Sequence, residues 1–484
     1  MLGNLHPQAS EYLRFLPEII LCMAGIVIMM LEAVAKGKRT YLGVISLIGI
    51  IAAFVANVWA YGDRGGAFHN MIVIDGYGTF FRALVLVVGF LCILASFSYL
   101  ERENAQTGEY YALIVFSLVG QCILCTASDL IMVFIGLEIS SIATYILAGF
   151  LRDDRRNNES ALKYFLLGSF ATAFLLYGIA WIYGLMGSTN LEEIGQVLGR
   201  GQHSTVLVGL AMALLFVGFA FKVSVAPFQI WAPDVYQGAA APVSAFMSAG
   251  PKAAAFAVFF RVFMTSFRTL DERWIPLVWG CALLTMVVGN FGALMQTNVK
   301  RLMGYSSIAH AGYVMVALTA ASQIGIAAAM FYLASYALMN IGAFVVISHI
   351  ASRNERYVKI EDLAGLGRRE PVTAALLAIF VFSLIGVPLT GGFFGKFYVF
   401  QAALNSHLVW LTVLGLINSA IAAYYYLKII VAIYMHDPGP ATEQLAPSLG
   451  LQLAMWGSAI GTLILGIFPS ALLSFASMSA AALR

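Results

Sequence analysis

Long apolar runs, separated by short polar breaks, cover almost the whole chain. A transmembrane helix needs about 20 consecutive apolar residues, and the pattern provides fourteen runs of suitable length. The predicted spans are 13–35, 41–61, 77–100, 110–127, 129–151, 158–186, 205–238, 240–265, 274–296, 299–321, 324–351, 372–403, 407–435 and 448–476. The segments between them are too short for a separate catalytic domain. The pattern predicts an all-α polytopic membrane protein with about 14 transmembrane helices.

Composition supports this fold class and excludes others. Of the 484 residues, 61% are hydrophobic and only 11% are charged, whereas soluble domains carry roughly 25% charged residues. A soluble enzyme and a disordered chain are both excluded. The net charge of +3 gives no basis for binding nucleic acid. The first residues lack the cationic start and cleavage pattern of a signal peptide, so the first run is expected to remain as a span.

The loops differ in their content of Lys and Arg, which predicts the orientation. With the N-terminus outside, the inner loops hold fourteen basic residues and the outer segments hold six. Because basic residues are concentrated in cytoplasmic loops, both termini are predicted on the outer side of a bacterial cytoplasmic (inner) membrane. Arg82 and Arg261 lie near outer span ends and are expected to reach the membrane surface by snorkelling.

Several charges fall inside apolar runs. The remaining five basic residues are all lysines in such runs: Lys163, Lys222, Lys252, Lys396 and Lys428. Glu138 lies near the middle of its span and is the one acid predicted to lie deep. A charge at the bilayer centre costs about 2.5–3.5 kcal/mol, so we expect these groups to have a use. For Lys163 and Lys428, snorkelling is an open alternative.

The choice of lysine favours proton transfer. Burial disfavours the ammonium and a nearby carboxylate restores it, so a buried lysine can gain or release a proton, whereas arginine stays charged. A Na⁺ or K⁺ site would instead need clustered carboxylate and carbonyl oxygens. Glu159 and Lys163 are spaced i, i+4 in the favourable order for an ion pair. An ordinary surface pair at a span end is the alternative for these two.

Two of the predicted spans contain helix breakers beside a lysine. In 205–238, Pro227 follows Lys222 by five residues, and in 372–403 Pro388 and several glycines precede Lys396. Proline cannot continue the helical hydrogen-bond ladder. Interrupted helices in corresponding positions of two halves indicate a transport site in many transporters. Kinks that serve packing alone are the alternative.

The spacing of the two breaks predicts an internal repeat. Spans four to eight and nine to thirteen form two five-helix units, each with its broken helix in fourth place. Because five is odd, the two units must be inverted. The predicted parts are 1–107, a three-helix segment; 108–266 and 267–436, the two repeats; and 437–484, the C-terminal helix. Glu138 and His310 lie in the second span of each unit. Histidine titrates near neutral pH, although a buried, hydrogen-bonded histidine is equally compatible with the sequence.

The chain offers no evident cofactor or metal site. Cys122 and Cys125 form a C-x-x-C inside an apolar run, but no second pair or nearby histidine accompanies them, which favours packing over metal or redox chemistry. There is no nucleotide fingerprint, cluster-binding cysteine set or haem motif.

Three segments resemble the antiporter-like subunits of respiratory complex I, and the N-type subunits most closely. They are FKVSVAPFQIWAPDVYQGAAAPVSAFMSAGPKAAAF, QTNVKRLMGYSSIAHAGY and GVPLTGGFFGKFYVF. The resemblance covers nearly the whole chain. It implies a proton-translocating subunit that works with NADH, FMN, iron–sulfur clusters and quinone held by partner subunits. Those partners would include other antiporter-like subunits and a peripheral redox arm.

The resemblance also implies roles for single residues. The positions that match the family's proton-transfer groups are Glu138, Lys163, Lys222, Lys252, His310 and Lys396. Glu138 is expected to pair with Lys222 and to set its proton affinity, and Lys396 to release protons to the outer side. One departure is Gln229, where many relatives carry histidine. Because glutamine does not titrate, a route past this position needs water or another group.

Two other functions are compatible with the sequence. A subunit of a multi-component cation/proton antiporter shares the fold and most motifs, and sodium dependence would distinguish it. A purely structural subunit with vestigial charges would tolerate replacement of the lysines, but the insertion cost of each charge makes this hypothesis the weakest.

Overall fold

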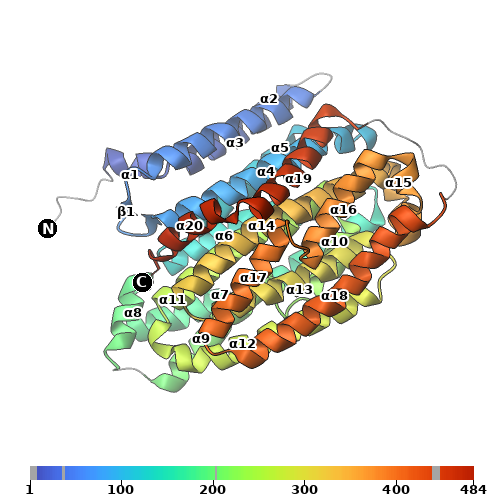
Figure 1. Ribbon diagram of the computed structural model, residues 1–484. Coiled ribbons are helices and arrows are strands. Elements are labelled where there is room, and N and C mark those ends of the chain that lie inside the picture. Colours follow the sequence, from blue (N-terminus) through green and yellow to red (C-terminus); the bar gives the residue numbers. More distant parts are fainter. Residues whose placement is uncertain (1–7, 35–38, 202–203, 439–446, 484) are drawn as a thin grey trace.

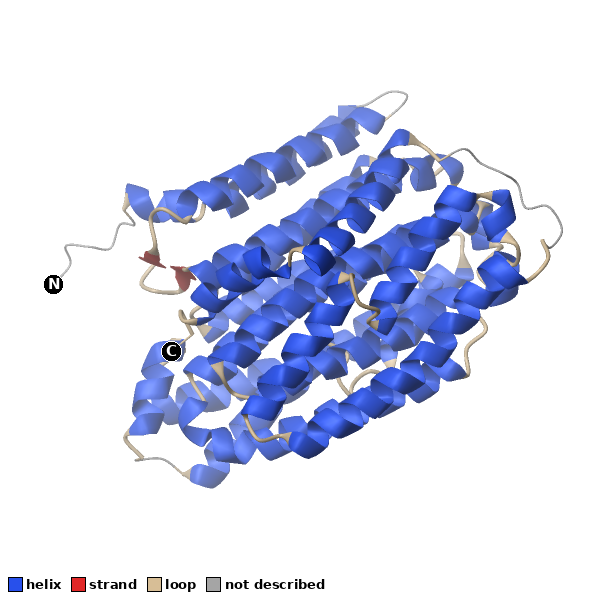
Figure 2. Ribbon diagram, viewed as in Figure 1, coloured by secondary structure: helices blue, strands red, loops and turns tan. Residues whose placement is uncertain are grey.

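The computed structural model describes residues 8–34, 39–201, 204–438 and 447–483, and helices dominate it (Figures 1 and 2). The first part of the chain forms α1 (Ala9–Arg14), α2 (Leu16–Val34), α3 (Thr40–Ala60) and α4 (Gly76–Arg102). A small antiparallel hairpin of β1 (Gly65–Ala67) and β2 (Ile72–Ile74) joins α3 to α4, with Gly65 opposite Ile74. Lys36, Lys38 and Arg484, which entered the orientation count, lie outside the described residues.

The middle and C-terminal parts are also helical. They comprise α5 (Gly108–Thr126), α6 (Leu130–Ala148), α7 (Arg155–Met186), α8 (Leu191–Gly199), α9 (Thr205–Lys222), α10 (Trp231–Gly238) and α11 (Ala241–Thr265). After the 3₁₀ turn η1 (Arg268–Leu270) follow α12 (Asp271–Leu294), α13 (Val299–Thr319), α14 (Gln323–Ile350), η2 (Arg353–Glu355), η3 (Ile360–Leu363), α15 (Leu366–Arg369), α16 (Pro371–Ile385), α17 (Gly391–Asn405), α18 (Val409–Met435), α19 (Leu449–Ile467) and α20 (Pro469–Ala480).

The predicted number of spans agrees with these helices. Within the described residues, twelve helices are long and apolar enough to cross a membrane. The 21-residue α13 and the pair formed by α16 and α17 occupy the two remaining predicted positions. Both predicted interruptions are present, because separate helices α9 and α10, and α16 and α17, replace one continuous span each.

The helices run roughly parallel in an elongated bundle with α11 and α14 at its centre (Figure 1). Nearly every residue in the apolar stretches of α11 and α14 is buried, whereas only about a third of those in α2 and α7 are buried. α11 packs against α4, α5 and α14, and α14 packs against α13, α16, α17 and α19. The most shielded positions of the molecule are therefore on α11, α14 and the helices beside them.

The bundle has two distinct ends. One carries α1, the hairpin, α8 and the C-terminal end of α20, and we name it the α1 end (Figure 1). Loops join there through backbone bonds, such as Ser128 N to Met71 O and Leu191 N to Ser128 O, both 2.9 Å. The opposite end, named the α15 end, gathers the loops that follow α4, α6, α14 and α18.

Two details of the sequence prediction were wrong. The expected last span, 448–476, is two helices, because Phe468 leaves the helical conformation and Pro469, which has no N–H, starts α20. Arg82 and Arg261 do not snorkel. Arg82 is fully buried and lies 2.6 Å from the carboxylate of Glu18, and Arg261 binds Asp75 at 2.8 Å.

The structure also buries an acid that the sequence did not single out, Glu18 near the start of α2. Glu18 is 1% exposed on α2, and Arg82 on α4 further donates to Thr126 Oγ1 at 3.2 Å on α5. A buried pair of this kind is costly to break from one side, because the remaining charge has no solvent. The pair thus fastens α2 to the body of the bundle.

Replacing Arg82 by methionine tests this role. R82M leaves the Glu18 carboxylate buried without a counter-charge, so we expect the chain to lose about 3–5 kcal/mol of stability. The measurement is thermal aggregation of the detergent-solubilised protein. R200M, which removes an exposed arginine, serves as the control, and the double variant E18M/R82M should recover much of the loss. Equal aggregation temperatures for R82M and R200M would contradict the assignment.

Candidate functional site

Lys222 is the last residue of α9, directly before the interruption of the seventh span. Its Nζ donates to Ser141 Oγ at 2.7 Å and to the Tyr145 hydroxyl at 3.2 Å, both on α6. The ammonium also lies 5.0 Å from the ring centre of Tyr145 and 5.5 Å from that of Tyr164, within the range of cation–π attraction. Neutral hydroxyls and aromatic rings therefore surround this amine.

Side chains complete the hydrogen bonding of the interrupted backbone between α9 and α10. The carbonyl of Phe221 accepts from Trp231 Nε1 at 3.0 Å, and the amide of Ala226 donates to Thr285 Oγ1 at 2.9 Å. Ser224 has a φ of +61°, in the left-handed region, and Pro227 lacks an N–H, so a continuous helix is excluded here. Irregular backbone at membrane depth is tolerated where protein groups satisfy it in this way.

Glu138 does not form the expected direct pair with Lys222 among the described residues. Lys222 binds Ser141 instead, which lies one turn along α6 from Glu138, and Oε1 of Glu138 is buried without a hydrogen-bond partner. The same face of α6 carries a row of exposed isoleucines: Ile131, Ile135, Ile142 and Ile146. Glu138 therefore lies beside the Lys222 site and, at the same time, next to an apolar outer face.

A small cavity separates the Lys222 site from α11. It measures about 20 Å³ and is bordered by Ser140, Ser141 and Thr144 of α6, by Lys222, and by Pro251 of α11. A cavity needs roughly 10–15 Å³ of this measure and several polar partners to hold a water molecule. The space therefore suits one water between Lys222 and the residue that precedes Lys252.

Lys252 lies at the centre of the bundle, where it is 2% exposed. Its Nζ donates to the carbonyl of Ser307 at 3.0 Å and to Ser307 Oγ at 2.5 Å, both on α13. The lysine thus links α11, in the first predicted repeat, with α13, in the second. As with Lys222, its hydrogen-bond partners among the described residues are neutral oxygen atoms.

His310 continues the polar row on α13 and joins two tyrosines. A hydrogen bond of 2.7 Å connects Nδ1 with the Tyr332 hydroxyl on α14, and one of 3.2 Å connects Nε2 with the Tyr426 hydroxyl on α18. The Tyr426 hydroxyl also binds Ser306 Oγ. Ser306 is the neighbour of Ser307, so hydroxyl groups connect the surroundings of Lys252 with the imidazole.

Lys396 occupies the second interruption, between α16 and α17. Its Nζ donates to the carbonyls of Leu384 and Ile385 at 3.0 and 2.8 Å and to Ser419 Oγ at 2.9 Å. The break leaves those two carbonyls at the end of α16 without helical partners, and the ammonium satisfies them. Gly386 has a φ of +94°, and a Cβ placed on it would lie 3.2 Å from Cδ of Lys396. A larger residue at position 386 therefore has little room.

Tyr313 lies between the last two groups of the row. Its ring centre is 5.7 Å from that of His310 and 5.1 Å from Lys396 Nζ. Tyr332, the partner of His310, packs against Gly395, the residue before Lys396. The structure thus brings His310 and Lys396 into one neighbourhood without a direct hydrogen bond between them among the described residues.

Lys163 and Glu159 form the predicted i, i+4 ion pair at 2.6 Å. Asp234 on α10 also binds Lys163, at 2.6 Å, and Arg301 on α13, at 2.5 Å. With its side chain 40% exposed, Lys163 lies nearer the α15 end than Lys222. Lys428 is exposed on α18 and stands apart from the row of buried groups.

Sequence reasoning missed the polar groups that connect the lysines. Hydroxyl residues such as Ser141, Ser307 and Tyr426 occur throughout apolar helices, and only their position opposite a lysine distinguishes them. It also counted Lys300 among the basic residues of the inner loops. Lys300 is 1% exposed and binds Glu355, whose Oε1 accepts from the Tyr99 hydroxyl at 3.0 Å. Glu355 is one of four acids between α14 and α16, so the sequence does not single it out as the partner.

The α15 end holds a further ionisable pair, between the last turn of α14 and the residue before α16. His349 Nε2 binds Glu370 Oε2 at 3.0 Å. This hydrogen bond holds the pKa of the Glu370 carboxyl below its usual range. Glu370 precedes α16 directly, so the pair fixes the start of the interrupted twelfth span to the end of α14.

The part of the chain that the structure describes contains no evident metal-binding site. No group of three or more His, Cys, Asp or Glu residues there is arranged to hold a metal ion. Cys122 and Cys125 are buried free thiols on α5. The amines, hydroxyls and imidazole of the buried row are groups that can accept and donate protons.

Comparison with known proteins identifies the family. Residues 127–422 match the family model described as NADH:quinone oxidoreductase/Mrp antiporter, TM. NADH-quinone oxidoreductase subunit N 1 of Solibacter usitatus is 59% identical over 483 residues, which cover 99% of each chain.

Solved structures agree with this match. A chain of respiratory complex I from Thermus thermophilus with bound aureothin has a TM-score of 0.81 and 32% identity, covering 95% of this chain and 98% of that one. A chain of the Mrp complex from Dietzia sp. DQ12-45-1b, at 20% identity and a TM-score of 0.86, shares the fold over 97% of each chain. The chain therefore belongs to the family of NADH-quinone oxidoreductase subunit N, among the antiporter-like membrane subunits.

Proposed function

We propose that this chain is the proton-translocating N subunit of an NADH-quinone oxidoreductase in a bacterial inner membrane. The observation that carries the proposal is the row of buried titratable groups between the two helix interruptions, namely Lys222, Lys252, His310 and Lys396. Their polar neighbours are hydroxyls and carbonyls on facing helices. Because buried charges are costly in a membrane, a row of such groups is expected only where a function requires it.

The first step of the proposed route leads from Lys222 to Lys252. Lys163 and Glu159 lie on the α15 side of Lys222 and would supply protons to it from the inner face. The cavity between Lys222 and Pro251 has room for one water molecule, which can relay the proton toward Lys252. Ser141 and Thr144 border that cavity and can orient the water.

The second step leads through α13. Lys252 donates to Ser307, and the adjacent Ser306 binds the hydroxyl of Tyr426, which in turn binds His310. A hydroxyl can accept one proton and donate another, so this chain suits transfer in either direction. Tyr332 and Tyr313 then lead from the imidazole to Lys396, which would release the proton to the outer side.

Electrostatic coupling between neighbouring sites would drive the transfer. Glu138, one turn from the Ser141 partner of Lys222, favours the ammonium form of that lysine while it is charged. At an effective dielectric of about 20, unit charges 7 Å apart interact by roughly 2.4 kcal/mol, which is nearly two pKa units. Loading one lysine therefore changes the proton affinity of the next.

The driving reaction takes place outside this chain. NADH, FMN, iron–sulfur clusters and quinone are assigned to partner subunits. Other antiporter-like subunits would lie beside it in the membrane. The outer face of α6 supports such a neighbour. Glu138 lies in a row of exposed isoleucines there, and a carboxylate next to lipid is costly unless a polar group of a partner subunit binds it. Lys428, exposed on α18, is a second charged residue that a partner subunit could bind, with less support from its surroundings.

The arrangement of the ends supports the proposed orientation and repeat. Basic residues gather in the loops of the α15 end, which we assign to the cytoplasm, leaving both termini outside. The units α5–α11 (108–266) and α12–α18 (267–436) start from opposite ends of the bundle. Each has an interruption in its fourth span, at Pro227 and Pro388, as an inverted repeat requires.

Replacing Lys222 by alanine in the assembled complex tests the central role of that residue. K222A removes the amine but leaves the surrounding helices in place, so proton uptake that accompanies quinone reduction should fall at least about tenfold, equivalent to roughly 1.4 kcal/mol. K359A, which removes an exposed lysine from the segment between α14 and α16, should leave uptake unchanged. Normal assembly with undiminished pumping in K222A would refute the role.

Tyr426 offers a finer test, because its hydroxyl can be removed while its ring stays in place. Y426F removes the hydroxyl between Ser306 and His310 but keeps the ring, so pumping should slow by about two- to tenfold, the equivalent of one hydrogen bond of roughly 0.5–1.5 kcal/mol. Y110F removes a buried hydroxyl that binds Ser96 Oγ at 2.9 Å, outside the proposed route. If both variants pump alike, the tyrosine link is not part of the route.

A cation/proton antiporter subunit is the alternative function, and the likeness to the Mrp complex chain supports it at the level of fold. The buried row contains lysines and no carboxylate cluster, which favours protons over Na⁺. We therefore expect transport by reconstituted vesicles to proceed equally in sodium-free and sodium-containing buffer. Transport that requires Na⁺, without co-purifying flavin and iron–sulfur subunits, would favour the antiporter.

A further inference from the structure

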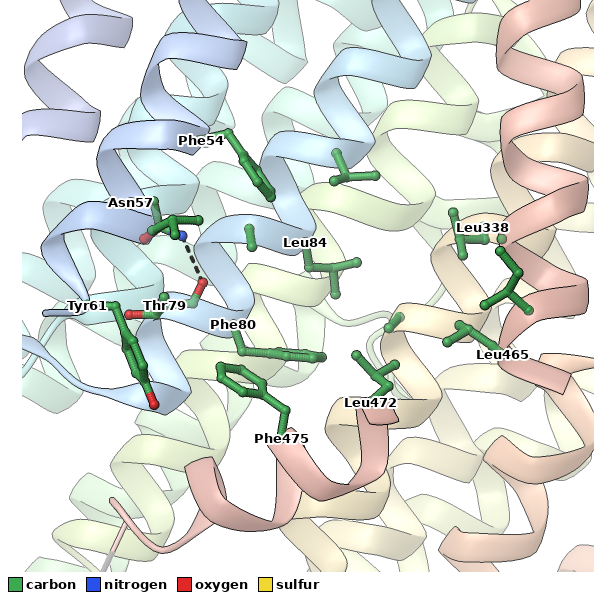
Figure 3. A pocket seen from close by; sticks show the side chains of 16 residues that line it. Phe54, Asn57, Tyr61, Thr79, Phe80, Leu84, Leu338, Leu465, Leu472 and Phe475 are labelled. Atoms are coloured by element: carbon green, nitrogen blue, oxygen red, sulfur yellow. Dashed lines mark hydrogen bonds between the residues drawn. The ribbon is translucent and has the colours of Figure 1, made fainter. Parts of the chain in front are cut away.

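An apolar slot, unrelated to the proton route, lies between the first helices and the last ones (Figure 3). Its volume is about 470 Å³. Phe54 of α3 and Leu84 of α4 form one side, and Leu465 of α19 and Leu472 of α20 form the other, with Leu338 of α14 next to Leu465. Almost all of the lining surface is hydrocarbon, so the slot suits an apolar guest.

The lining of the slot follows one face of α4. It extends from Thr79 to Val87, which is about 12 Å at 1.5 Å per residue. A cavity of about 470 Å³ along this length suits a hydrocarbon chain, which is narrower than the roughly 10–12 Å of a helix with its side chains.

The surroundings show where one end of the slot opens. α3, α4, α14 and α19 are all candidate membrane spans, so the medium outside is lipid. At the end of α3 stand Trp59, which is 59% exposed, and Tyr61, whose ring carries the guanidinium of Arg64 at 4.0 Å. Tryptophan, tyrosine and basic residues mark the headgroup level of a bilayer.

Two polar residues border the slot near the same end. Asn57 is fully buried, and its Nδ2 donates to the carbonyl of Thr79 at 3.0 Å. Oδ1 of Asn57 and Oγ1 of Thr79 are buried and have no hydrogen-bond partner. Buried polar groups are normally satisfied, so a polar group of a ligand is expected beside them, one turn below the aromatic residues.

We propose that this slot binds one membrane phospholipid. An acyl chain fills the slot along α4, the glycerol ester lies at the level of Thr79 and Asn57, and the phosphate lies at Arg64 and Tyr61. The threonine hydroxyl donates to an ester carbonyl, and the guanidinium pairs with the phosphate. Such a lipid joins α3 to α19 and α20 and so connects the start of the chain to its end.

Photocrosslinking identifies the occupant directly. Benzoylphenylalanine replaces Phe54 in the slot or, as a control, the exposed Phe170 of α7, and the complex is purified with repeated washing in mild detergent before illumination. We expect an adduct with the mass of a phospholipid at position 54 and no lipid adduct at position 170. An adduct to another polypeptide or to a quinone, or no adduct at position 54, overturns the proposal.

A slot-filling variant provides a second, independent test. A83F places a ring in the slot from α4, and the matched control A52F adds the same ring to an exposed position of α3. We expect washed complex carrying A83F to retain one phospholipid fewer than the unmodified complex and A52F to retain the same number, counted by native mass spectrometry. R64Q should weaken retention as well. Unchanged lipid content in A83F contradicts the proposal even if pumping is normal.

Discussion

The hydrocarbon of a bilayer offers no hydrogen bonds, and this constraint governs most of the structure. Every backbone group at membrane depth must find a partner inside the protein. Where α9 and α16 end within the membrane, side chains provide those partners. Trp231 and Thr285 do so at the first interruption, and Lys396 at the second. The interruptions are thus stable because specific residues replace the missing helical bonds, and one of those residues is itself a titratable group.

The same constraint separates the buried cations into two groups. Arg82, Arg261 and Lys300 each bind a carboxylate and hold helices or loops together near the ends of the bundle. The interior amines of Lys222, Lys252 and Lys396 bind hydroxyl and carbonyl oxygens instead. A carboxylate would fix the ammonium form, whereas neutral oxygens stabilise it less. The three interior lysines proposed to change protonation state therefore have no carboxylate among their hydrogen-bond partners in the described residues.

The sequence was sufficient for the fold class, the number of spans, both interruptions and the family, because apolar runs, prolines and glycines report on local structure. It also singled out the interior lysines, since a charge in an apolar run is conspicuous. It could not select Ser307 or Tyr426 as their neighbours, because hydroxyl residues are common in these helices and only packing decides which of them faces an amine. Arg82 was misplaced for a related reason, because its partner Glu18 lies 64 residues away in the chain. Whether the two five-helix units are an inverted repeat stays a prediction.

The half-helix α10 has a consequence for how distant changes reach the first interruption. Its Asp234 binds Lys163 of α7 and Arg301 of α13, while its first residue, Trp231, donates to the last turn of α9 and stacks on Tyr164 with ring centres 4.5 Å apart. These eight residues thus have an ionic contact at one point and an indole contact at the other. A displacement of α7 or α13 would therefore be passed through α10 to the residues around Lys222.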